Sequence, residues 1–145
     1  MPDQPTFQDR QNRTWKLTLD FVKLRAIRDK TAIDFGDLAN FPNAWASFIY
    51  DDSAALDAVW VAIHPSPAPA MTDDWLGAMD GECLEAAREA MHEALVFFIP
   101  PKKRQTLEQA IKSVEKGMAM AMEQAEKKID QALTEAMEKF QASGT

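Results

Sequence analysis

The residues from Thr106 to Phe140 read TLEQAIKSVEKGMAMAMEQAEKKIDQALTEAMEKF. This stretch has no proline and one glycine, Gly117, and its apolar residues recur at steps of three and four. That spacing places them on one face of an α-helix. Three glutamate–lysine pairs four residues apart, each contributing about 0.3 kcal/mol, support the helix: Glu108–Lys112, Glu123–Lys127 and Glu135–Lys139. We predict a helix of about 35 residues, about 50 Å long.

The apolar face of this helix is longer than the preceding residues can plausibly cover, so we expect it to bind a partner. The candidate partner-binding residues are Met118, Met122, Ile129, Leu133 and Met137. Methionine adapts to varied surfaces, which favours an adaptable contact with another chain. A packed core or a coiled-coil seam is the alternative interpretation. If the helix is a separate arm, deletion of residues 104–145 leaves the first hundred residues folded.

Prolines divide the rest of the chain. Pro100 and Pro101 precede the long helix, so we predict a first domain over residues 1–101 and a long C-terminal helix over 102–145. Between residues 21 and 99, apolar spacing predicts a set of shorter helices, and the Pro-rich segment 64–70 predicts an extended connector. The aromatic residues expected in the core are Trp15, Trp45, Trp60 and Phe98.

The N-terminal residues have a different period. Trp15, Leu17 and Leu19 alternate with polar residues, as in a half-buried strand. Residues 6–8 are expected to pair with that strand across a turn at 9–12. A lone hairpin is marginally stable, so it must lie against helices or another subunit. The fold class predicted is therefore mainly α: an N-terminal β-hairpin on a small helical domain, followed by a long C-terminal amphipathic helix.

The sequence lacks the residues that common catalytic and metal sites need. It has one cysteine and two histidines, too few for a usual structural zinc site. The spacing of Glu89 and His92 occurs in di-iron bundles, but those need a second copy of the motif, which this chain lacks. Cys83 is expected to be structural. We therefore predict a protein that is not an enzyme, with no cofactor and no metal.

Charge and hydropathy exclude further classes. The net charge is −7, and residues 31–100 hold one basic residue, Arg88, against twelve acidic ones, a net of −11. Phosphate would repel this segment, so nucleic acid is not an expected partner. No apolar stretch approaches the roughly 18 residues that span a bilayer, and the N-terminus lacks the layout of a signal peptide. We expect a soluble cytoplasmic protein.

The order of several short motifs resembles one known family. The motifs are Arg13-Thr-Trp-Lys-Leu-Thr-Leu, Ile49-Tyr-Asp-Asp, Met71-Thr-Asp-Asp-Trp, Met79-Asp-Gly-Glu-Cys and Val96-Phe-Phe-Ile-Pro. Over about residues 7–101, this order resembles the tail assembly chaperones of long-tailed phages and prophages, which are encoded near the tape measure protein. The long C-terminal helix lies outside the resemblance.

The resemblance implies a non-enzymatic protein that binds the long, helical tape measure protein and assists assembly of the tail tube. It also implies self-association into a homo-oligomer in the host cytoplasm, and absence from the mature virion. The alternative interpretation is a structural tail or connector subunit that stays in the particle. In that case the hairpin would pair with other strands and the long helix would form a coiled coil.

Overall fold

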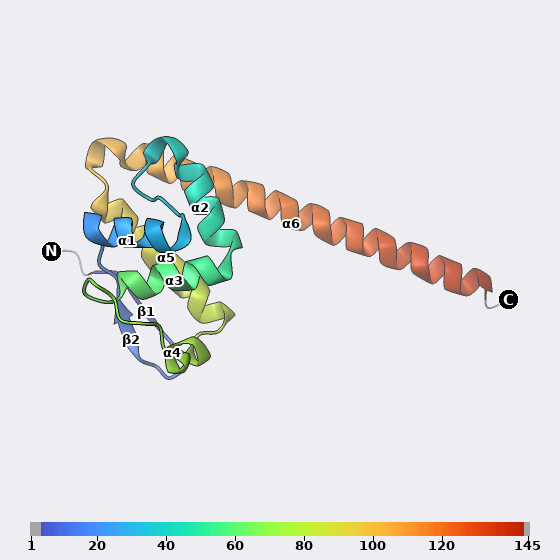
Figure 1. The fold of residues 1–145 in the computed structure, drawn as a ribbon. Coiled ribbons are helices and arrows are strands. Elements are labelled where there is room, and N and C mark those ends of the chain that lie inside the picture. The colour runs from blue at the N-terminus through green and yellow to red at the C-terminus, as the bar shows by residue number, and fades with distance from the viewer. Residues whose placement is uncertain (1–3, 144–145) are drawn as a thin grey trace. The chain divides into compact units, whose positions relative to one another are not determined.

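The computed structural model describes residues 4–143 and shows the predicted fold class (Figure 1). Two short strands form an N-terminal hairpin, a set of shorter helices follows, and one long helix is the last of the described elements. The elements are β1 (Thr6–Gln8), β2 (Thr14–Lys16), α1 (Phe21–Thr31), the 3-10 helix η1 (Leu38–Asn40), α2 (Phe41–Tyr50), α3 (Asp52–Ala62), α4 (Asp73–Ala78), α5 (Gly81–Phe98) and α6 (Pro101–Ser143).

Side-chain caps fix where four of the helices begin. The side chains of Asp20, Asp51, Thr72 and Asp80 accept hydrogen bonds from backbone amides in the first turns of α1, α3, α4 and α5. Each satisfies an amide that has no partner inside its own helix.

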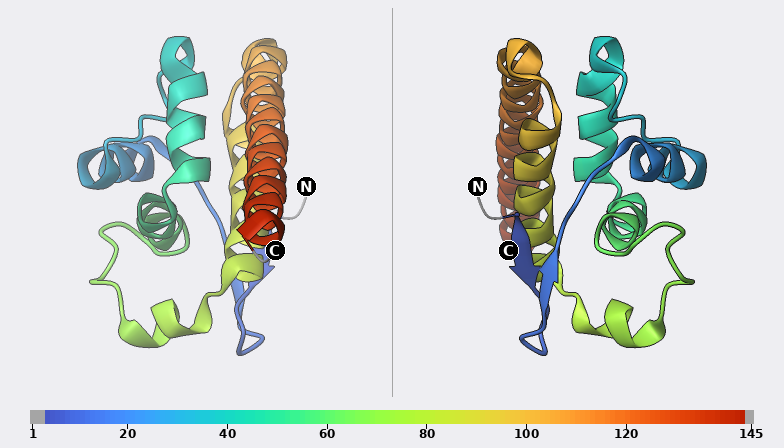
Figure 2. Two further views of the ribbon diagram at one scale, coloured as in Figure 1. Left: turned by 90° about the vertical axis from the view of Figure 1, so that its right-hand side faces the viewer. Right: turned by 90° about the vertical axis from the view of Figure 1, so that its left-hand side faces the viewer.

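The hairpin is antiparallel, with Phe7 opposite Trp15, and the turn lies at the predicted place. The second strand ends at Lys16, so it is shorter than the predicted alternation to Leu19. Phe7 is buried, and β1 packs against α5 (Figure 2). The hairpin is therefore held by helices, as a marginally stable two-stranded sheet requires.

Helix α3 is central, because it packs against α1, α2 and α5 (Figure 2). Beside it lies a cluster of fully buried aromatic rings from α2 and the preceding loop. Its members are Phe35, Phe41, Trp45 and Phe48, with ring centroids 5.2 to 6.3 Å apart in the contacting pairs. Trp60 and Trp75 form a second buried contact at 5.1 Å.

Two of the four predicted core aromatics are buried as expected, Trp45 and Trp60. The prediction was wrong for Trp15 and Phe98, which are half-buried. Trp15 lies in a two-stranded sheet and turns its indole N–H toward Asp9. Phe98 is the last residue of α5, where its ring meets the exposed ring of Phe21 edge-on at 5.0 Å.

The chain divides into two compact units, one ending at Ile111 and one beginning at Lys112. The predicted boundary at Pro100-Pro101 marks the start of α6, not the end of the first unit. The first turns of α6 belong to that unit because Leu107 and Ile111 are fully buried in it. The second unit is the remainder of the same helix.

Candidate partner-binding surface

The second unit carries a row of exposed apolar side chains. Met122, Ile129, Leu133 and Met137 are between 56 and 64% exposed, and Met118 is half-buried. These are the five residues that the sequence suggested for partner binding. Exposed side chains of this size are normal singly, but a continuous row on one face marks an interaction surface.

Helix geometry brings these five residues together. Met118 and Met122, Ile129 and Leu133, and Leu133 and Met137 are each four residues apart, so each pair is adjacent on the helix surface. Met120 is 54% exposed but lies on the opposite side of the helix. Local interactions support the helix, including the ion pair of Lys127 with Glu123 at 3.4 Å.

The same face is used differently near the start of α6. Leu107 and Ile111 have the same spacing as the exposed residues but are fully buried in the first unit. The sequence pattern alone does not separate the buried part of the face from the exposed part. The difference is that the helix up to Ile111 belongs to the first compact unit, whereas the helix from Lys112 onward does not.

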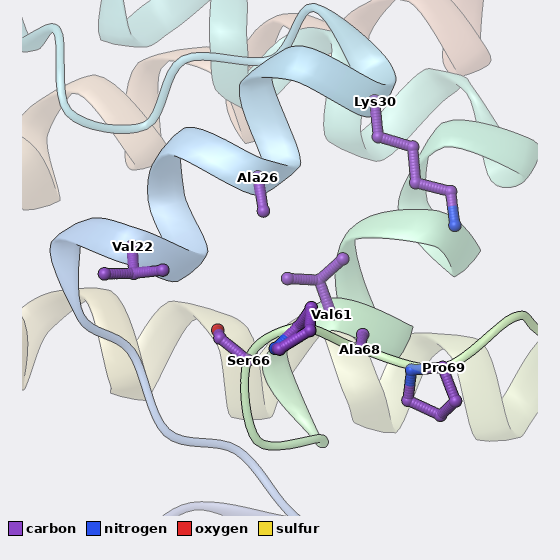
Figure 3. A pocket seen from close by; sticks show the side chains of 8 residues that line it. Val22, Ala26, Lys30, Val61, Ser66, Ala68 and Pro69 are labelled. Carbon is purple, nitrogen blue, oxygen red and sulfur yellow. The ribbon is translucent and has the colours of Figure 1, made fainter.

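A shallow apolar groove of about 440 Å³ lies on the first unit (Figure 3). One side is α1, and the other is α3 with the Pro-rich loop. Its lining residues are Val22, Ala26, Lys30, Val61, Ser66, Pro67, Ala68 and Pro69. The groove was not predicted, because its walls come from three segments whose contact no local pattern shows. Short aliphatic side chains dominate it, and the Lys30 ammonium lies 3.8 Å from Asp57.

The buried charged residues of the first unit hold the fold together. Arg88, the one basic residue of the acidic segment, donates to the Phe48 carbonyl at 3.1 Å and to Asp52 at 2.8 Å. The Lys23 ammonium donates to the backbone oxygens of Thr18 and Ala62, each at 3.0 Å. These bonds join helix ends to neighbouring elements, so both cations are already occupied by protein acceptors.

Asp9 is the third buried charged residue and organises the hairpin turn. Its carboxylate accepts from the Gln11 amide, from the amide and Nε of Arg13, and from the Trp15 indole, at 2.7 to 3.1 Å. Burial raises the pKa of Asp9, but these hydrogen bonds, with that from Trp15 the largest, outweigh it and lower the pKa below its ordinary value. Asp9 therefore stays ionised.

Lys23 and Cys83 also have shifted pKa values, but neither side chain is an activated nucleophile. Burial lowers the pKa of Lys23, although the charge of Asp20 opposes the shift, but its nitrogen is already bonded to the carbonyl oxygens of Thr18 and Ala62. Contact with the Asp80 backbone lowers the pKa of the half-buried Cys83 thiol, but burial and the Asp80 carboxylate together prevail and raise it. A raised pKa keeps a thiol protonated and unreactive.

Between residues 4 and 143, no three His, Cys, Asp or Glu side chains come together in a way that could hold a metal ion. His92 of the Glu89–His92 motif instead meets the Trp45 ring at 5.9 Å. None of the described helices has both the length and the apolar character needed to cross a bilayer.

Comparison with known proteins identifies no relative. No family model matches the chain, and neither a curated protein nor a solved structure matches it.

Proposed function

We propose that this chain is a non-enzymatic phage tail assembly chaperone that binds the tape measure protein through the exposed apolar face of α6. One observation carries the proposal: Met122, Ile129, Leu133 and Met137 form a row of large, more than half-exposed apolar side chains on a helix. An amphipathic or apolar helix of a client can pack along such a row.

The helix is suited to a client because it is formed before the client arrives. Binding by an already ordered helix avoids the entropy loss of folding on contact. The flexible thioethers of Met118, Met122 and Met137 let the same face fit different turns of a long client. The strongly acidic segment 31–100 favours solubility while apolar surface is exposed.

The order of motifs over residues 7–101 supports the choice of client, because it resembles the tail assembly chaperones. On this proposal the protein works in the host cytoplasm, associates with its own copies and is absent from the mature virion. Neither nucleic acid nor a membrane is a partner, and no cofactor is used.

Co-expression with a candidate tape measure protein, followed by pull-down, tests the proposal. The full chain should retain the client. The double variant Met122→Lys with Ile129→Lys should lose it, because two ammonium groups then face an apolar surface. Met120→Lys places a charge on the opposite side of the helix and should bind normally. Full binding by the double variant would move the site off this face and contradict the proposal.

A second function, a structural tail or connector subunit, is favoured by the hairpin. The sheet in the described residues has two strands, in the order β1-β2, so a further strand has an edge to pair with. Mass spectrometry of purified particles separates the two functions. A chaperone should be missing from the particles, whereas a structural subunit should be present in a fixed ratio to the other tail proteins.

A further inference from the structure

The apolar residues of α6 repeat every 11 positions. Leu107, Met118, Ile129 and Phe140 are spaced by 11 residues, and so are Ile111, Met122 and Leu133. With Val114, Ala125 and Ala136 included, the steps between successive members are four, three and four, repeated without interruption. An 11-residue repeat makes slightly more than three whole turns of helix, so the apolar face nearly keeps its direction along the axis.

Small residues occupy two further positions of the same repeat. Ala110, Ala121 and Ala132 are spaced by 11, and Val114, Ala125 and Ala136 are too. They lie beside the large residues on the side away from Leu133. The face is therefore about 100° wide, with large side chains along one half and alanine along the other. Alanine lets a second helix approach closely.

The first of these repeats is covered by the protein itself, and the others are not. Leu107 and Ile111 are fully buried in the first unit, whereas Met122, Ile129 and Leu133 are more than half exposed. Every side chain from Ala119 to Ala142 is exposed. Residues 118–139 thus present two complete repeats, in which every side chain except the half-buried Met118 is exposed.

The two edges of this face differ in charge. On the edge beside the large residues lie Glu126 and Asp130, and on the edge beside the alanines lie Lys128 and Lys139. Glu135 also lies toward the alanine side, four residues before Lys139 and in reach of it along the helix. Between residues 118 and 139, one edge is thus purely acidic and the other is mainly basic.

We propose that a second copy of this chain covers the face, with the two α6 helices parallel and in register over residues 118–139. In a parallel pair, opposite edges of the two helices meet, whereas in an antiparallel pair like edges meet. Parallel packing places Lys128 of each chain level with Glu126 and Asp130 of the other, within two residues or about 3 Å along the axis. Antiparallel packing places carboxylates beside carboxylates.

This inference concerns the same face as the proposed function but does not need the client. Self-pairing covers the apolar residues until a tape measure helix displaces one copy. Its experiments therefore use the full chain alone, while the pull-down above tests the client. If the self-association experiments fail, the pull-down can still be interpreted, and the reverse also holds.

Single cysteines test the direction of packing. In a Cys83→Ser background, Met118→Cys, Ala125→Cys and Ala136→Cys place one thiol each at three levels of the face. In a parallel, in-register pair each variant forms a disulfide with its own kind, because equivalent residues lie opposite each other at a bridgeable distance. Met120→Cys, on the opposite side, is the matched control and should stay monomeric on a non-reducing gel.

Other outcomes overturn the proposal. Antiparallel packing would give a different pattern. Only one of the three variants would form a disulfide with its own kind, and a mixture of Met118→Cys and Ala136→Cys chains would form mixed disulfides. No linkage at any level, at the highest concentration the protein tolerates, would show that a second copy does not cover the face. Circular dichroism verifies that each variant keeps its helix.

Charge reversal tests whether the acidic edge of one helix meets the basic edge of the other. Lys128→Glu should weaken self-association about tenfold, because it replaces attraction by repulsion at two symmetric places. Adding Glu126→Lys and Asp130→Lys to that variant should restore association. Lys116→Glu makes the same charge change away from the face and should leave the dissociation constant unchanged. Tighter association of Lys128→Glu would indicate that basic edges meet, which contradicts parallel packing.

Discussion

The ammonium of Lys23 donates a hydrogen bond to the carbonyl oxygen of Ala62 at 3.0 Å, which ties helix α1 to the last turn of α3. The same ammonium donates to the Thr18 carbonyl at 3.0 Å and to the Thr18 hydroxyl. Ala62 also accepts from the Thr18 amide at 3.2 Å. A lysine has three donors, and here protein oxygens accept all three. The negative end of the α3 dipole adds to the attraction.

Replacing Lys23 by methionine should therefore destabilise the first unit. Methionine keeps most of the buried hydrocarbon but removes the three hydrogen bonds, and we expect a loss of about 1–3 kcal/mol in the free energy of unfolding. Lys30→Met, on the exposed side of the same helix, is the control and should change it by less than about 0.5 kcal/mol. Urea unfolding followed by tryptophan fluorescence measures both. Equal stability of the two variants would show that the Lys23 contacts contribute nothing net.

The Asp9 carboxylate should make stability depend on acid. Its pKa is lowered in the folded chain, so the ionised form is favoured by folding. A lowered pKa stabilises the fold above the ordinary carboxyl range, and this contribution is lost as pH falls through the folded pKa, below about pH 4. Asp9→Asn should therefore be less stable than the wild type at neutral pH, and the difference should shrink as the pH falls below about 4. A difference that is independent of pH would contradict this account.

Trp60 is 3% exposed, its indole N–H donates to the Pro69 carbonyl at 2.6 Å, and its ring meets Trp75 edge-on. Trp60→Ala should reduce the free energy of unfolding by about 3–5 kcal/mol, since a large cavity opens in the core. Trp60→Phe keeps an aromatic ring but removes the N–H, so its loss should be smaller. Chemical denaturation of the three proteins gives the comparison. A loss below about 1 kcal/mol for Trp60→Ala would show that the core closes around the gap.

Local patterns in the sequence predicted much of this fold. Apolar spacing predicted the shorter helices between residues 21 and 99, and in α1 the spaced residues Leu24 and Ile27 are buried. Phe21 fits the same spacing but is 77% exposed: it is the first residue of the helix, and its ring meets that of Phe98. Periodicity identifies the face of a helix, but it does not tell how far along the helix the neighbouring elements extend.

The burial of Lys23 and Arg88 could not be predicted, because their acceptors include backbone carbonyls of distant elements. Arg88 looks like one exposed charge on an amphipathic helix, yet its Nε bonds to the carbonyl of Phe48, forty residues earlier. The five candidate partner-binding residues on α6 were identified from helical spacing alone, and four of them, all except the half-buried Met118, are exposed. The groove beside Val22 depends on three segments at once and had no sequence signal.

Truncations of α6 test the division of the chain, and the structure changes where the cut should fall. Deletion of residues 104–145 removes Leu107 and Ile111, both fully buried, and Arg104, whose Nε donates to the Val96 carbonyl at 2.8 Å and to the Ile99 carbonyl at 3.1 Å. Burial of two aliphatic side chains of this size contributes about 3–6 kcal/mol. We therefore expect this variant to be strongly destabilised, contrary to the expectation from sequence that it stays folded.

Deletion of residues 116–145 removes most of the second unit but keeps a turn of helix beyond Ile111, so that fraying at the new end does not reach the buried residues. This shorter deletion should leave the free energy of unfolding and the tryptophan emission of the first unit nearly unchanged, because all four tryptophans precede the cut. It should also abolish self-association and client binding, since both proposed contacts lie on residues 118–139. If the two deletions were equally stable, Leu107 and Ile111 would contribute nothing to the core. If the shorter deletion still bound a tape measure protein, the client site would lie on the first unit.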